Sequence, residues 1–176
     1  RTGKMFAIEN YEVAPDIMTM AKALGNGTPI SAFIASAKIA DSYTQPGAST
    51  LGGNPVSSTA ALATLDYINS QQLVEKAQLR GAQLRAGLEA LQQRHPIIGD
   101  IRGFGLMLGA ELVHPDKSPA ADELENILEE MKDRGFIVGK NGINRNVMAF
   151  QPPLVITEED INQLLNTLDD VLKKYQ

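Results

Sequence analysis

Short apolar runs dominate the first third of the chain. The runs IMTMAK (17–22) and ISAFIAS (30–36) are separated by the glycine-rich ALGNGTP. Neither run alternates cleanly between apolar and polar residues, so the pattern predicts two strands around a tight turn, each buried on both faces. Residues 1–16 predict a loop with one helical turn, 37–43 a short helix, and 44–55, rich in Gly, Pro, Ser and Thr, a loop.

Beyond these strands the apolar residues are spaced as in helices. The spacing predicts helices over 56–70 and 72–94. The stretch HPIIGDIRGFG (95–105) is predicted to break the helical pattern, and LMLGAELV (106–113) to form a strand. One face of the second helix carries the apolar residues Leu73, Ala77, Leu84, Leu88 and Leu91.

The segment SPAADELENILEEMKDRG predicts another helix. Ser118 is its expected N-cap, Pro119 stands at the first helical position, and Gly135 is the expected stop. Strands are predicted at FIVG (136–139) and NVMAF (146–150). The apolar stripe of this helix comprises Leu124, Ile127, Leu128 and Met131.

The last predicted helix covers 157–175. Thr157 is its expected N-cap, and Asp160, three residues on, makes a variant of the capping box. Ile156 and Ile161 are spaced to form a hydrophobic staple across the start of the helix.

The order of these elements predicts an α/β chain with an uneven domain organisation. Residues 80–176 predict a small α+β domain, and residues 57–79 a connecting helix. Residues 1–56 contain only two strands, and both need neighbouring strands that this sequence does not contain.

The composition is that of an ordinary globular protein. The chain has 176 residues, of which 43% are hydrophobic and 21% charged, and its net charge is −5. This charge predicts no binding to nucleic acid or to an anionic membrane, and no apolar run approaches the roughly 18 residues of a spanning helix. With no cysteine, and with His95 and His114 as its two histidines, the sequence predicts no metal site. We expect a cytoplasmic protein, with His95 capping a helix or exposed.

Lys22 stands between an apolar run and the glycine-rich turn. An unpaired ammonium buried at a strand end costs several kcal/mol, unless the group gives up its proton. A neutral amine there can attack an aldehyde and form an imine, and pyridoxal phosphate (PLP) is the usual aldehyde. Its phosphate needs hydroxyls and free backbone N–H groups, which Ser49, Thr50 and the glycines of STLGGNP (49–55) would supply. From the spacing alone, an exposed turn lysine beside an ordinary loop is the favoured alternative.

Two other glycine-rich sites do not fit the sequence. A P-loop places its lysine after the glycines and before Ser or Thr, whereas Lys22 precedes them. The stretch GFGLMLG (103–109) has glycines like those of a dinucleotide fingerprint, but it leads into a predicted strand rather than a helix.

Several separate motifs resemble one enzyme family. Residues 1–33, STLGGNP, IRGFGLMLGAEL (101–112) and PPLVIT (152–157) occur in the order found in the C-terminal part of class III PLP-dependent aminotransferases. This group includes ornithine, acetylornithine, 4-aminobutyrate and alanine–glyoxylate aminotransferases. The resemblance implies a fragment of a fold-type I PLP transferase, with the end of the large α/β domain in 1–56 and the small domain in 80–176.

The resemblance also implies which residues act. Lys22 matches the lysine that holds PLP as an imine and then carries the proton between substrate and cofactor. Thr50, assisted by Ser49, matches the residue that binds the cofactor phosphate of the neighbouring subunit, which implies a homodimer with its active site at the interface. Arg102 matches the arginine that grips the substrate carboxylate through two parallel hydrogen bonds. Asn26 stands where members often have glycine, and asparagine tolerates a left-handed backbone.

The reaction implied by the resemblance moves an amino group from an amino acid to a 2-oxo acid. In the family, an aspartate that pairs with the cofactor ring precedes the position of Arg1, so the chain alone is predicted to be inactive. Two alternatives remain, an aminomutase on the same scaffold and a non-catalytic oligomerisation or binding module.

Overall fold

The computed structural model describes residues 1–175, and contacts group them into two compact units. The N-terminal unit comprises Ile8–Leu73. The C-terminal unit comprises Arg1–Ala7 and the chain from Val74 onward. The predicted division of the sequence at residues 56 and 79, which refers to the domains of a complete enzyme, stays a prediction.

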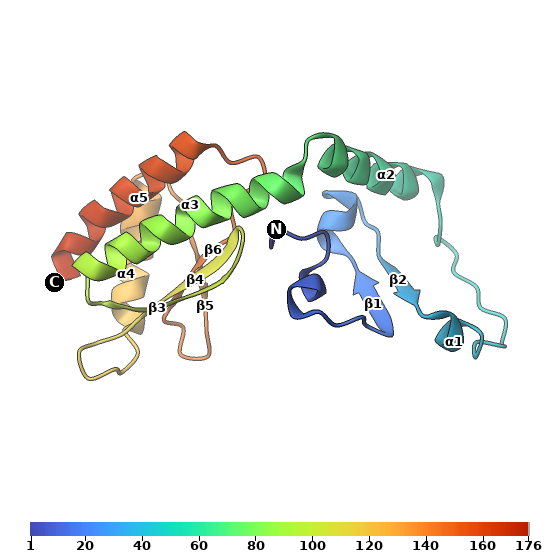
Figure 1. Ribbon diagram of the computed structural model, residues 1–176, viewed down its shortest axis with the longest axis horizontal. Helices are drawn as coiled ribbons and strands as arrows, with labels where there is room; N and C mark the ends of the chain where they lie inside the picture. Colours follow the sequence, from blue (N-terminus) through green and yellow to red (C-terminus); the bar gives the residue numbers. More distant parts are fainter. Residues whose placement is uncertain (176) are drawn as a thin grey trace. The chain divides into compact units, whose positions relative to one another are not determined.

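The N-terminal unit contains the short elements that the sequence predicts. Its strands pair antiparallel, with Ile17 opposite Ala35 and Met20 opposite Ala32 (Figure 1). The first strand ends before Lys22, which begins a 3-10 turn instead of ending the strand as predicted. The elements are η1 (Ala7–Tyr11), β1 (Ile17–Met20), η2 (Lys22–Gly25), β2 (Ala32–Ala35), α1 (Ala37–Ala40) and α2 (Pro55–Ser70).

The predicted burial of both strands is wrong in this structure. The side chains of Ile17, Phe33 and Ile34 are 51%, 73% and 52% exposed. A strand is buried on both faces only when further layers cover the sheet, and two strands of four residues each cannot provide these layers for one another.

The C-terminal unit is built on a four-stranded antiparallel sheet. The strands are β3 (Ile98–Phe104), β4 (Met107–Leu112), β5 (Gly139–Asn141) and β6 (Val147–Phe150), in the spatial order β3-β4-β6-β5. Its helices, drawn in Figure 1, are α3 (Leu73–Arg94), α4 (Ala121–Asp133), α5 (Glu158–Leu172) and the short η3 (Lys173–Tyr175).

One face of this sheet and the three α-helices enclose the hydrophobic core. All five apolar residues predicted on one face of α3 are buried, which confirms that helix and its orientation. On β4 the core residues alternate with more exposed ones, as expected for a strand with one covered face. The core includes Leu84, Leu88, Leu91, Leu108, Ala110, Leu112, Leu124, Ile127, Met131, Ile161 and Leu168.

Three local predictions in this unit are wrong. Residues 95–105 contain β3 rather than only a break. Helix α4 begins after Ala120 without a side-chain cap, because the Ser118 hydroxyl donates to Asp116 in the preceding turn and Pro119 bridges to Val113. The strand predicted at 136–139 is shifted along the chain, because β5 begins at Gly139 and ends at Asn141.

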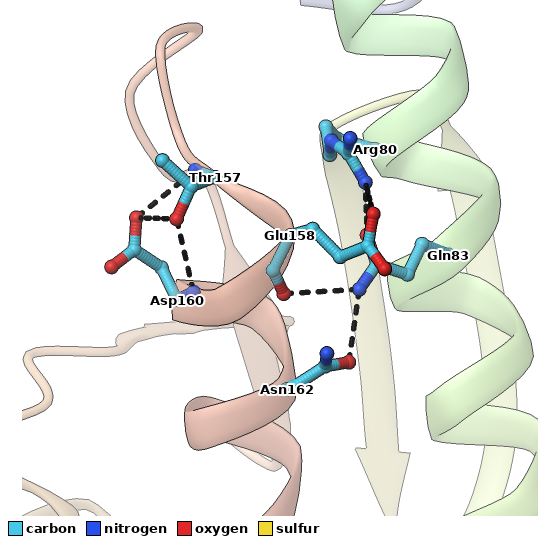
Figure 2. A network of polar contacts seen from close by, with 6 residues as sticks. All are labelled: Arg80, Gln83, Thr157, Glu158, Asp160 and Asn162. Carbon is cyan, nitrogen blue, oxygen red and sulfur yellow. Dashed lines mark hydrogen bonds and ion pairs between the residues drawn. The ribbon is translucent and has the colours of Figure 1, made fainter.

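The capping box of α5 is confirmed. The Thr157 hydroxyl accepts from the backbone N–H of Asp160 at 3.1 Å, and the Asp160 carboxylate accepts from the Thr157 N–H at 3.0 Å (Figure 2). Ile156 and Ile161 both pack against the hydrophobic core, as the predicted staple requires.

Polar contacts align α5 with α3. Arg80 pairs with Glu158 at 2.9 Å, and Gln83 donates to Asn162 at 3.0 Å (Figure 2). Farther along both helices, Arg94 pairs with Asp169. The residue numbers rise together on the two helices, so α3 and α5 run side by side in the same direction. No helix within residues 1–175 is long and apolar enough to cross a lipid bilayer.

Candidate active site

Lys22 occupies an unusual backbone conformation. Its φ of 52° lies in the left-handed region, which a residue with a Cβ rarely adopts without a structural or functional reason. The turn is closed by hydrogen bonds from the Leu24 N–H to the Ala21 carbonyl (3.1 Å) and from the Asn26 N–H to the Ala23 carbonyl (3.2 Å). Asn26 has a φ of 47°, the conformation that asparagine was expected to tolerate.

The Lys22 side chain is exposed, so its expected burial at a strand end is wrong in this structure. It lines an open hollow of about 910 Å³ in the N-terminal unit. Ser49 and Gly52 line the same hollow, so the structure brings the predicted lysine and part of the predicted phosphate loop together. Thr50 is exposed and is not among the lining residues. The rest of the wall comes from Thr19, Met20, Ala21, Ser31, Ala32 and Phe33.

The loop that contains Ser49 has a backbone that only small residues allow. A Cβ atom at Gly52 would lie 2.9 Å from the Ser49 Oγ, and Gly53 has a φ of 69°. The turn is closed by the Gly52 N–H, which donates to the Ser49 carbonyl at 3.3 Å. A hydroxyl next to closely approachable backbone suits a phosphate, and the amine across the hollow suits an aldehyde, so the residues present fit PLP.

Asn54 and Ser57 connect this loop to helix α2. The Asn54 Oδ1 accepts from the Ser57 N–H at 3.0 Å, and Pro55 begins the helix. The sequence Asn-Pro is an ordinary helix-start signal and could have identified this cap. Sequence analysis did not find Ser57, whose buried hydroxyl donates to the Pro29 carbonyl at 2.9 Å.

Arg102 lies on β3 in the C-terminal unit, where it pairs with two carboxylates of its own chain. Its Nη1 is 2.7 Å from the Asp100 Oδ2 and 2.6 Å from the Glu111 Oε2. The hydrogen bonds that Arg102 donates to Asp100 and, to a smaller extent, to Glu111 raise the pKa of the guanidinium above its already high ordinary value. Asn146 helps to hold Glu111, because its Nδ2 donates to the Glu111 Oε1 at 3.3 Å.

Both of these contacts use the same nitrogen of Arg102. Within residues 1–175, the edge formed by Nε and Nη2 has no hydrogen-bond partner, and about half of the side chain is exposed (51%). A guanidinium can use this edge to bind a carboxylate through two parallel hydrogen bonds. The two acidic neighbours reduce the net positive charge that an incoming carboxylate would meet.

His95 is buried rather than exposed. Its Nε2 is 2.6 Å from the Asp169 Oδ1, and because a carboxylate only accepts, the histidine nitrogen donates. The Nδ1 atom is buried and has no partner among the described residues. Hydrogen bonding from His95 is the main reason that the pKa of Asp169 is lowered, with Arg94 adding to it. This pair links the end of α3 to α5 and is not part of the hollow around Lys22.

The chain has the fold of part of a fold-type I PLP transferase, and the predicted fold class is thereby confirmed. The model of the aminotransferase class-III family matches residues 1–172, and the chain belongs to this family. PLP is the cofactor of the family.

Curated relatives extend over nearly the whole chain. An alanine–glyoxylate aminotransferase 2 homolog 2, mitochondrial, from Arabidopsis thaliana is 42% identical over 99% of this chain and 37% of its own length. A leucine/methionine racemase from Thermococcus litoralis is also 42% identical, over 96% of this chain and 38% of its own length.

Solved structures also match nearly the whole chain. A phospholyase from Arthrobacter in complex with phosphoethanolamine matches 98% of this chain with a TM-score of 0.95 and 35% identity, over 42% of its own length. This chain therefore spans about two fifths of the length of the proteins that it matches.

Proposed function

We propose that the chain is part of a PLP-dependent aminotransferase, which moves an amino group from an amino acid to a 2-oxo acid and is active only as the complete protein. The observation that supports this most directly is the hollow shared by Lys22 and the Ser49–Gly52 loop in a chain of the aminotransferase class-III family.

In this proposal each residue has a distinct task. PLP, when bound, supplies the electron sink that stabilises negative charge on the substrate α-carbon. Lys22 carries the only amine among the residues lining the hollow, and as a neutral amine it takes a proton from that carbon and returns it. The hydroxyls of Ser49 and Thr50 donate to the phosphate, and Arg102 binds the substrate carboxylate through its unpaired edge.

We also propose a homodimer in which Thr50 serves the site of the neighbouring subunit, and a cytoplasmic location. One exposed apolar residue in the loop and one just after it support an interface at this position. Leu51 is 74% exposed and Val56 is 76% exposed, and apolar side chains next to a binding loop are stabilised when a second subunit covers them.

The direct test is chemical labelling of Lys22. The longest natural polypeptide that contains this sequence is purified with PLP, its visible absorbance is recorded, and the sample is reduced with borohydride and mapped by peptide mass spectrometry. The expected result is a visible band that borohydride removes, with the pyridoxyl group on Lys22. Stable labelling of a different lysine, or no visible band, would overturn the proposal. The 176-residue chain measured in parallel is expected to show no turnover.

The comparisons also favour a second kind of reaction, elimination or racemisation, catalysed by the same residues. The solved structure with a TM-score of 0.95 is a phospholyase, and one curated relative is a racemase. All three reactions begin by removing a proton from a carbon next to the nitrogen, which Lys22 could do in each. Incubation with an amino acid and a 2-oxo acid distinguishes them, since only transamination makes a new amino acid. Inorganic phosphate released from phosphoethanolamine indicates the lyase, and loss of optical purity indicates the racemase.

A further inference from the structure

The buried residues of the N-terminal unit lie mainly where the lysine turn η2 packs against helix α2, a contact called the joint below. Its buried residues are Gly25, Ser57, Ala61 and Leu73. Gly25 ends the η2 turn that Lys22 begins, and α2, which contains Ser57 and Ala61 in its first two turns, packs against η2. The joint between the lysine turn and α2 is therefore the best-packed part of a unit that is otherwise largely exposed.

Ser57 makes hydrogen bonds on both sides of this joint. Its hydroxyl donates to the Pro29 carbonyl at 2.9 Å, and its backbone N–H donates to the Asn54 Oδ1 at 3.0 Å. Pro29 follows shortly after the lysine turn η2, and between them the Thr28 N–H donates to the Gly25 carbonyl at 3.0 Å. Ser57 thus holds the lysine turn with its side chain and the cap of α2 with its backbone.

Asn54 continues the connection to the Ser49–Gly53 loop. Its Nδ2 donates to the Leu51 carbonyl at 3.0 Å, and its backbone N–H donates to the same carbonyl at 3.3 Å. Hydrogen bonds and short stretches of backbone therefore connect the turn that begins with Lys22, through Ser57 and Asn54, to the loop whose Ser49 and Gly52 line the same hollow.

We propose that Ser57 is a positioning residue that holds the loop that binds the cofactor phosphate in place against the lysine turn of its own chain. The inference rests on the proposed function, because PLP is the molecule that has to reach both groups. In the proposed homodimer this loop serves the site of the neighbouring subunit, so loss of the Ser57 hydroxyl displaces the phosphate-binding loop that the neighbouring site uses.

The test compares PLP with pyridoxal, which carries the same aldehyde and lacks the phosphate. The dissociation constants of both are measured on the complete protein from the visible absorbance band. The wild-type protein is expected to prefer PLP strongly. Ser57→Ala is expected to reduce the ratio of the pyridoxal to the PLP dissociation constant about five-fold, because the loop is no longer held against the lysine turn. A role in folding alone would weaken the binding of both aldehydes equally.

The neighbouring residue provides a matched control. The Ser58 hydroxyl makes no hydrogen bond within residues 1–175, so Ser58→Ala is expected to keep the wild-type ratio. Ser57→Cys, which keeps the side-chain shape with a somewhat larger atom and weakens the donor, is expected to lower the ratio too. It decides the question if Ser57→Ala does not fold. A ratio unchanged in the Ser57 variants, or equal weakening for both aldehydes, would overturn this proposal alone. A wild-type protein that binds neither aldehyde would overturn the proposed function as well.

Discussion

A Cβ atom on Gly81 would lie 2.2 Å from the carbonyl carbon of Gly105, so helix α3 crosses the β3–β4 turn with no room for a side chain. The N-terminal segment reaches the same point from another direction. A Cβ on Gly105 would lie 2.6 Å from the Arg1 carbonyl oxygen, which accepts from the Leu106 N–H at 2.8 Å. Three segments that are distant in the sequence therefore meet at two glycines.

This contact predicts that Gly81→Ala destabilises the protein. Alanine is favoured over glycine in a helix interior by about 1 kcal/mol, so propensity alone would make the variant more stable. The added methyl group meets backbone atoms that cannot move aside, and such overpacking costs about 1–3 kcal/mol or more. We expect a net loss of about 1–2 kcal/mol in urea unfolding followed by circular dichroism.

Gly87→Ala in the same helix is the matched control. Its Cβ would lie 2.1 Å from the Leu165 Cδ1, which is the end of a flexible side chain and can rotate away. A smaller loss of stability is therefore expected. If Gly81→Ala were the more stable of the two variants, the close backbone approach at Gly105 would be contradicted.

The helices of the C-terminal unit were predictable because their signals are local and periodic. The apolar stripe of α3 and the capping box of α5 are both read from residues a few positions apart. Strand β3 was not predictable in this way. Gly99 and Gly103 interrupt its side-chain pattern, and a Cβ at Gly99 would lie 2.6 Å from the Cγ2 of Val113, a contact that no local pattern marks.

The candidate site likewise contains residues that local sequence identifies and residues that only distant contacts reveal. Lys22 and the loop from Ser49 were identified by residue type and order, which a family resemblance preserves. Ser57 and His95 act through partners that are 28 and 74 residues away in the sequence, Pro29 and Asp169. No local pattern marks such contacts, since they arise only when the chain folds.

The pair of His95 and Asp169 predicts how stability depends on pH. The pKa of Asp169 is lowered by the hydrogen bond from His95, so the folded state favours the ionised carboxylate. The resulting stabilisation is fully present above the unfolded pKa of about 3.9 and is lost as the pH falls through the lower folded value. Asp169→Asn should therefore cost about 1–2 kcal/mol near neutral pH. The difference from the wild type should disappear at acidic pH.

Urea unfolding at a series of pH values measures this effect, and Asp170→Asn is the control. Asp170 pairs with Lys173 at the surface, and such exposed pairs contribute about 0–1 kcal/mol. A cost of Asp169→Asn that stays constant from neutral to acidic pH would show that the ionised carboxylate is not what stabilises this contact.

Lys22→Ala is expected to leave folding intact and to abolish turnover in the complete protein. The side chain is exposed and makes no hydrogen bond or ion pair within residues 1–175, so little stability depends on it. Circular dichroism and a melting curve check the fold, and formation of the new amino acid checks activity. Turnover near the wild-type rate would refute the catalytic assignment of Lys22.

Arg102→Lys separates substrate binding from the local ion pairs. Lysine keeps the charge and can still pair with Asp100 or Glu111, and exposed pairs contribute little, so unfolding should change by less than about 1 kcal/mol. Lysine cannot form two parallel hydrogen bonds to a carboxylate, so the KM for carboxylate substrates should rise by an amount equivalent to about 2 kcal/mol. An unchanged KM would contradict substrate binding by Arg102 and leave it only the ion pairs with Asp100 and Glu111.

A mixed dimer tests whether Thr50 acts in the site of the neighbouring subunit. Lys22→Ala and Thr50→Ala are each expected to be impaired on their own, the first in turnover and the second in affinity for the phosphate of PLP. If each site takes its lysine from one chain and its threonine from the other, a mixed dimer contains one site with both defects and one site with neither. Refolding the two variants together should then restore part of the activity at limiting PLP, whereas sites built within one chain would show no gain over the separate variants. Because Lys22 and Ser49 line one hollow of a single chain, a site built within one chain is the alternative to the proposed dimer, and this experiment distinguishes the two.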